Sequence, residues 1–251
     1  FFTMAVGIPV IAFVYLWALT PSIAILLWLL FGLGDYSGFA FSFSCPTADI
    51  CDNAWQTFNW HPFLMTVAFL TLFSQAIVSF KLLPIPHMKA KLVHFSIQTL
   101  GMICSIIGFI IIVTFKIKTD NYNFYTAHSY LGLLGIVFFI IQYTVGFISF
   151  LFPKLPDKPR ATVHSFHIFA GFCIYVLTLT AIFTGIADRQ LIGGWGGYGM
   201  STSVYSYSWI GANLVLIFGI TVAISVFWVH RPPTNRALYA KQHKDTLDED
   251  L

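Results

Sequence analysis

Six long apolar segments limit what this chain can fold into. Each is about twenty residues or more, the length an α-helix needs to cross a hydrocarbon core of about 30 Å. They cover roughly residues 5–33, 60–80, 93–115, 128–152, 163–187 and 205–229. The chain is 57% hydrophobic and 9% charged over 251 residues, a balance that soluble domains do not show. We predict an all-α, polytopic membrane protein with six transmembrane helices in a single domain over residues 1–251.

Four successive apolar segments open with a histidine. His61 opens the second segment, His94 the third, His128 the fourth and His167 the fifth. An imidazole within a membrane segment is costly without a partner, so each of these residues is a candidate functional group. Segments two and four start at one membrane face, and segments three and five start at the other. His61 and His128 should therefore share one depth, and His94 and His167 another.

Two histidine pairs at two depths are what two haems with two axial imidazoles each require. We therefore expect helices two to five to form a four-helix core, about residues 55–190, that binds two haem b groups. In the fifth segment His167 is preferred over His164, because only one of the two can match the depth of His94. Two alternatives stay open: a haem-free transporter or proton channel with a histidine relay, and a haem-bearing structural subunit of a larger redox complex.

Glycines recur near three of the histidines. Gly101 and Gly135 each follow a histidine by seven residues, and Gly171 follows His167 by four. A missing side chain one or two turns from a histidine would leave room for a flat macrocycle. Small residues also let membrane helices approach each other, so helix packing is the alternative explanation.

Basic residues are distributed unequally between the two sides of the predicted bundle. One side carries ten of them: Lys81, Lys89, Lys91, Lys154, Lys158, Arg160, Arg231, Arg236, Lys241 and Lys244. The other side carries only Lys116, Lys118 and Arg189. Positive residues favour the cytoplasmic face, so we expect both termini to be cytoplasmic. No basic residue precedes segment 5–33, so we interpret it as a mature helix rather than a cleaved signal.

The four cysteines fall into two groups. Cys45 and Cys51 lie close together in the loop 34–58, on the side opposite the basic loops. In an oxidising compartment this spacing favours a disulfide, and two free thiols are the alternative. Cys104 and Cys173 lie inside apolar segments and are expected to be small packing residues.

The segments around the four histidines resemble the haem-ligand segments of the cytochrome b561 family. The similar segments are residues 59–62, 91–94, 126–132 and 166–171, and the resemblance covers about residues 55–230. The resemblance implies a six-helix, usually dimeric protein that takes single electrons from cytosolic ascorbate. The electrons pass through two b haems to monodehydroascorbate or a ferric chelate on the far side. By position, His61 with His128 and His94 with His167 would be the axial ligands.

The basic face could bind an anionic donor such as ascorbate or the haem propionates. The candidate residues are Lys81, Lys89, Lys91, Arg160 and His164. Their alternative explanation is that they only set the topology. A plasma membrane, a secretory vesicle and a lysosome or vacuole all satisfy this arrangement, and we expect no nucleic-acid partner.

Overall fold

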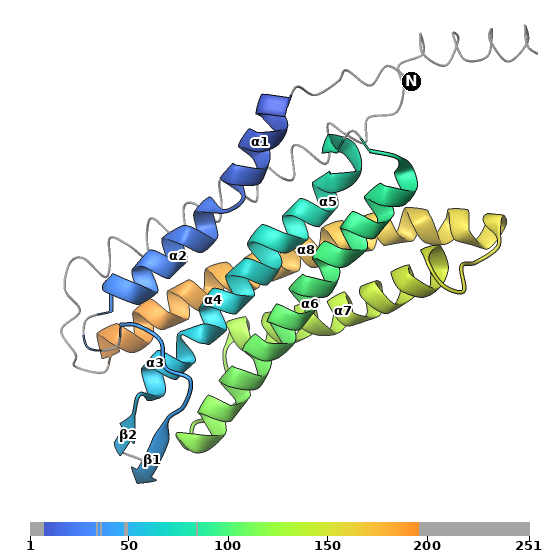
Figure 1. Cartoon of the computed structure of the whole chain (residues 1–251). Coiled ribbons are helices and arrows are strands. Elements are labelled where there is room, and N and C mark those ends of the chain that lie inside the picture. The colour runs from blue at the N-terminus through green and yellow to red at the C-terminus, as the bar shows by residue number, and fades with distance from the viewer. Residues whose placement is uncertain (1–7, 34, 36, 48–49, 84, 196–251) are drawn as a thin grey trace, which may run out of the picture.

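The described part of the chain is a bundle of long helices (Figure 1). The computed structural model describes residues 8–195 except 34, 36, 48, 49 and 84. Five helices there are long and apolar enough to cross a membrane: Ala12–Phe31, Ala54–Phe80, His87–Lys118, Ala127–Phe150 and Asp157–Arg189. The prediction of an all-α polytopic membrane protein is confirmed, and the predicted sixth segment, 205–229, lies outside the described residues.

The first span is broken into two helices, α1 (Ile8–Trp17) and α2 (Thr20–Phe31). Pro21 lies in the first turn of α2 and has no N–H to reach the carbonyl of Trp17 four residues earlier. The hydroxyl of Thr20 donates to that carbonyl at 2.6 Å instead. A side chain thus replaces the missing backbone donor, as membrane helices require at a proline.

Residues at the break in the first span hydrogen-bond to the second span. The Thr71 hydroxyl donates to the carbonyl of Ala18 at 3.0 Å and pairs with the Ser22 hydroxyl at 2.7 Å. Both hydroxyl-bearing side chains are buried, at 6% and 7% exposed. Hydrogen bonds of this kind help to hold helices together in lipid. The lipid tails are as apolar as the side chains, so the hydrophobic effect does not drive one helix against another.

The second span runs through four connected pieces. They are α3 (Ala54–Phe58), α4 (Trp60–Thr66), the π-helical segment η2 (Val67–Leu72) and α5 (Phe73–Leu82). The span therefore begins before the predicted start at residue 60. The side chains at its start hydrogen-bond to the backbone of the preceding loop: Gln56 donates to the carbonyl of Asp35, Asn59 to that of Gly38 and Trp60 to that of Ala40.

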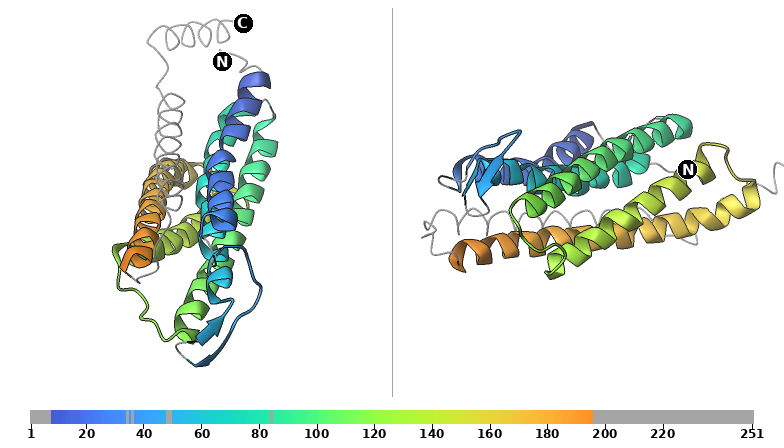
Figure 2. Two further views of the ribbon diagram at one scale, coloured as in Figure 1. Left: turned by 90° about the vertical axis from the view of Figure 1, so that its left-hand side faces the viewer. Right: turned by 90° about the horizontal axis from the view of Figure 1, so that it is seen from below.

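The remaining spans are three uninterrupted helices, α6 (His87–Lys118), α7 (Ala127–Phe150) and α8 (Asp157–Trp195). Helices α7 and α8 form an antiparallel pair that packs as a second layer against α4–α6 (Figure 2). One buried core joins the layers, and α2, α4, η2, α5, α6, α7 and α8 all contribute to it.

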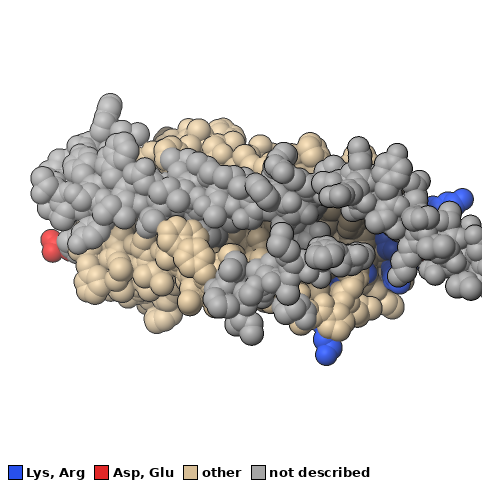
Figure 3. Space-filling view, turned by 90° about the horizontal axis from the view of Figure 1, so that it is seen from above, with Lys and Arg blue, Asp and Glu red and all other residues tan. Residues whose placement is uncertain are grey.

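The two ends of the bundle differ in chemistry. One end carries a small antiparallel hairpin, β1 (Ser44–Thr47) with β2 (Ile50–Asp52), and we call it the hairpin end. The other carries Lys89, Lys91, Lys154, Lys158 and Arg160, and we call it the basic end. Figure 3 shows lysine and arginine side chains gathered at one end of the visible face.

Candidate functional site

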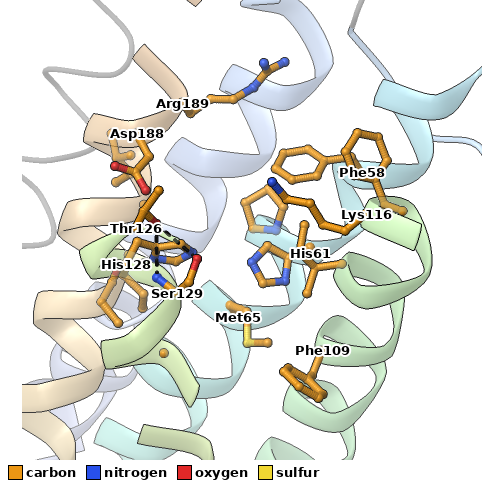
Figure 4. Close-up of a pocket in the computed structure, with 18 of the residues that line it drawn as sticks. Phe58, His61, Met65, Phe109, Lys116, Thr126, His128, Ser129, Asp188 and Arg189 are labelled. Carbon is orange, nitrogen blue, oxygen red and sulfur yellow. Dashed lines mark hydrogen bonds between the residues drawn. The ribbon is translucent and has the colours of Figure 1, made fainter. Parts of the chain in front are cut away.

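Near the hairpin end, the structure brings His61 of α4 and His128 of α7 together. Their ring centroids lie 6.1 Å apart at an interplanar angle of 76°, and the two rings face one pocket (Figure 4). The Nδ1 atom of His61 lies 3.0 Å from the carbonyl oxygen of Gly108, and that of His128 lies 2.7 Å from the carbonyl of Ala181. A carbonyl only accepts, so each Nδ1 carries the proton and each Nε2 keeps a free lone pair.

Near the basic end, His94 of α6 and His167 of α8 form a second pair. Their ring centroids lie 6.3 Å apart at 67°. The Nδ1 of His94 donates to the carbonyl of Ala76 at 2.8 Å. The Nδ1 of His167 is buried and has no hydrogen-bond partner among the described residues. The pairing by depth that the topology predicted is thus the pairing that the packed helices adopt.

His167 and His164 have different surroundings, although both lie on α8. The ring of His164 lies 6.1 Å from Phe150 at 90°, and the residue is exposed. His167 is the one whose ring meets His94. Its ligand role stays a prediction, but the geometry agrees with the preference for His167.

Two glycines make room for His128 of α7 and His167 of α8. A Cβ added at Gly185 of α8 would lie 2.7 Å from Cε1 of His128. A Cβ added at Gly146 of α7 would lie 3.0 Å from Cε1 of His167. His128 and His167 therefore pack directly on the backbone of the opposite helix, and a larger residue at Gly185 or Gly146 would displace the ring.

The glycines chosen from the sequence have another environment. A Cβ at Gly101 would meet the carbonyl oxygen of Ala68 at 3.5 Å, and one at Gly135 would meet Cγ2 of Thr178 at 2.8 Å. A Cβ at Gly171 would lie 3.2 Å from Nε2 of Gln142. These contacts are between neighbouring helices, so they support the packing explanation rather than the macrocycle.

The spacing in both pairs suits an ion held between two imidazoles. A metal–nitrogen bond to histidine is about 2 Å and the ring centre lies about 1 Å beyond, so two opposed imidazoles place their centres about 6 Å apart. The observed separations are 6.1 and 6.3 Å. The backbone carbonyls behind three of the rings are the usual outer partners of metal-bound histidines. The residues present therefore fit a haem iron in each pair: His61 with His128 would hold one, and His94 with His167 another.

A cavity of about 340 Å³ lies beside the first pair. Its lining includes His61, His128, Met65, Phe109, Lys116 and Arg189 (Figure 4). The Lys116 ammonium lies 4.7 Å from the ring centre of Tyr125, and the Arg189 guanidinium lies 4.3 Å from that of Trp55. From the sequence, Lys116 and Arg189 indicate only the topology of the chain. Their position one helical turn or less from a span end was the available sign that they could reach a site near His61 or His128.

The basic end holds the residues proposed from the sequence for an anionic donor. Lys91 and Arg160 are half-buried, and Lys89 is exposed. Lys91 lies close enough to Lys154 and Arg160 for mutual repulsion. Arg160 also pairs with Asp157. The side chain of Lys81 lies outside what the structure describes.

The β-hairpin carries the predicted disulfide region. Cys45 on β1 is disulfide-bonded, and β1 pairs with β2, which contains Cys51. The side chain of Cys51 is outside the described part, so the Cys45–Cys51 link stays a prediction. Cys104 and Cys173 are free thiols; Cys104 is half-buried and Cys173 is exposed on the described bundle.

The fold and its paired histidines define the class: a helical membrane protein with two histidine pairs inside its bundle. Comparison with known proteins then gives the family. Residues 60–193, more than half of the chain, match the family described as eukaryotic cytochrome b561. This chain belongs to that family.

Three relatives show how far the similarity extends. The chain is 33% identical over 138 residues to transmembrane ascorbate ferrireductase 2 of Arabidopsis thaliana, covering 55% of this chain and 60% of that protein. It is 29% identical over 172 residues to probable ascorbate-specific transmembrane electron transporter 1 of Oryza sativa subsp. japonica, covering 67% and 72%. It is 30% identical over 135 residues to a lysosomal membrane ascorbate-dependent ferrireductase of Mus musculus, covering 53% and 56%. The match thus spans less than two thirds of the first and third relatives.

Proposed function

We propose that this protein is a transmembrane oxidoreductase that passes single electrons from ascorbate, through two b haems, to an acceptor on the other side of the membrane. The acceptor would be monodehydroascorbate or a ferric chelate. The observation that carries the proposal is the presence of two facing histidine pairs, at 6.1 and 6.3 Å, toward opposite ends of one apolar bundle. The names of the relatives, which are ascorbate ferrireductases and ascorbate electron transporters, support the donor.

The chain's own side chains would hold the haems and shield them from water. His61 with His128 would bind one iron, and His94 with His167 the other. The haems would supply the one-electron chemistry. Nδ1 hydrogen bonds to backbone carbonyls fix the rings of His61, His94 and His128, so these rings need not reorganise when charge arrives.

The basic end is the proposed entry for electrons. Ascorbate is an anion at neutral pH, and Lys91, Lys154 and Arg160 lie near one another there. Their combined positive potential would raise the local concentration of an anionic donor. The excess of positive charge at this end also favours a cytoplasmic location for it.

The hairpin end is the proposed exit for electrons. The lining of the cavity beside His61 and His128 includes residues of α3, α6 and α8, with the cations Lys116 and Arg189 and the carboxylate Asp188 among them. Both anticipated acceptors carry negative charge, which these two cations would attract. An acceptor held in this cavity would lie next to the His61 and His128 site.

The test is made with purified protein in liposomes. We expect two haems per chain by pyridine haemochrome assay, a low-spin spectrum, and reduction of an enclosed ferric chelate by ascorbate added at the basic face. A colourless protein would favour the histidine-relay transporter or channel. A haem protein that ascorbate does not reduce would favour the structural subunit.

A further inference from the structure

Four aromatic rings fill the middle of the bundle. Phe69 and Phe73 belong to the second span, Phe139 to α7 and Tyr175 to α8, and all are between 1% and 4% exposed. The ring centroids of Phe73 and Tyr175 lie 5.8 Å apart in a stacked arrangement at 21°. Phe139 lies 5.2 Å from Phe73 and 5.6 Å from Phe69. We call these four rings the central aromatic cluster.

The central aromatic cluster lies between the two histidine pairs. On α8, Tyr175 falls between His167 and Ala181, whose carbonyl accepts the hydrogen bond of His128. On α7, Phe139 lies between His128 and the part of the helix that contacts His167. On both helices the rings of the cluster therefore lie between the groups that contact one histidine pair and those that contact the other.

The hydroxyl of Tyr175 does not explain why the residue is there. It is buried and has no hydrogen-bond partner among the described residues. A buried hydroxyl without a partner is unfavourable, so phenylalanine would pack at least as well. The feature of Tyr175 that the described bundle uses is its ring, stacked on Phe73.

We propose that the central aromatic cluster is the bridge for electron transfer between the two sites, and that Tyr175 is a positioning residue in it. Electrons tunnel faster through atoms in contact than across a void. Protein interiors are close-packed, but truncating a buried ring leaves a cavity because the neighbours relax only in part. In the transfer one iron would lose an electron and the other would gain it; no bond would form or break, and the tyrosine would stay neutral.

The inference rests on the proposed function, so its test begins with a parent protein that binds two haems. A pulse of a small reducing radical loads one electron per protein, and absorbance follows its redistribution between the sites. Tyr175→Leu should slow this redistribution, with haem content and both midpoint potentials unchanged. Tyr175→Phe, which keeps the ring, should redistribute at the parent rate.

A matched control comes from the same helix. Phe183 is 41% exposed, so Phe183→Leu should leave the rate unchanged. Redistribution at the parent rate in Tyr175→Leu with both haems present would overturn the bridge but not the proposed function. If Tyr175→Leu fails to assemble, Phe73→Leu gives the same test, with the same overturning result. A parent protein without haem would instead refute the proposed function itself.

Discussion

At the scale of single residues, His128 of α7 and His167 of α8 each lie against a glycine of the other helix. A new Cβ at Gly185 would overlap the ring of His128, and one at Gly146 would overlap the ring of His167. Contacts of 2.7 and 3.0 Å are too short for carbon atoms, so a ring must move. If these imidazoles hold haem iron as proposed, even a small displacement of either ring should weaken coordination.

The Gly185→Ala variant should therefore lose or alter only the haem at the His61 and His128 site. The Gly146→Ala variant should lose or alter only the haem at the His94 and His167 site. Haem content and low-temperature absorption spectra measure both effects. Gly101→Ala is the control, because its Cβ would make an ordinary 3.5 Å contact with the carbonyl of Ala68. A Gly185→Ala protein with the parent spectrum would contradict the expected role of this glycine.

The two histidines of α8 should differ sharply on substitution. His167→Ala should remove the haem nearer the basic end and stop electron flow across the membrane, because its ring faces His94. His164→Ala should keep two low-spin haems and at most change the ascorbate kinetics, because His164 is exposed and packs on Phe150. Haem stoichiometry distinguishes them, and loss of a haem only in the His164 variant would reverse the assignment.

At the scale of the elements, the π-helical segment η2 sets the register between α4 and α5. His61 donates to the carbonyl of Gly108 on α6, and His94 on α6 donates back to the carbonyl of Ala76 on α5. The stretch from 61 to 76 is one residue longer than the stretch from 94 to 108. A π-turn closes its hydrogen bond one residue later than an α-turn, so η2 accommodates the extra residue.

Deleting Val67 should consequently convert η2 to α-helix and keep both haem sites. The equivalent deletion of Ile107 in α6 should not be tolerated in the same way. It would turn the following residues by about 100° and shift them by about 1.5 Å, which moves the carbonyl of Gly108 away from His61. Haem content of the two deletion variants is the measurement. Loss of haem after deletion of Val67, at normal expression, would show that η2 does more than set the register.

At the scale of the whole molecule, more basic residues lie at the basic end than at the hairpin end, and Figure 3 shows lysine and arginine side chains gathered at one end of the visible face. Lys91→Gln should raise the ascorbate concentration needed for half-maximal haem reduction. Added salt should diminish the difference from the parent, because the Debye length falls from about 10 Å at 0.1 M to about 3 Å at 1 M. Stopped-flow reduction at several salt concentrations measures this. Lys118→Gln, at the hairpin end of the bundle, is the control, and a salt-independent effect of Lys91→Gln would indicate a role in folding or haem binding.

The sequence by itself determined the class of fold and the pairing of the histidines. Both depend on features read along a single segment: the length of each apolar stretch, and the end of it at which a histidine stands. Since successive spans alternate in direction, His61 had to share a depth with His128 and His94 with His167. The structure agrees with both pairings.

The tertiary structure decided which backbone atoms and small residues surround each imidazole. Gly146 and Gly185 were not distinguishable from the other glycines in the sequence, because their role depends on the register of α7 against α8. Likewise Lys116 and Arg189 reach one cavity only through the packing of α6 and α8 around α4. Contacts between residues far apart in the chain follow from how whole helix surfaces fit together, and no single segment contains that information.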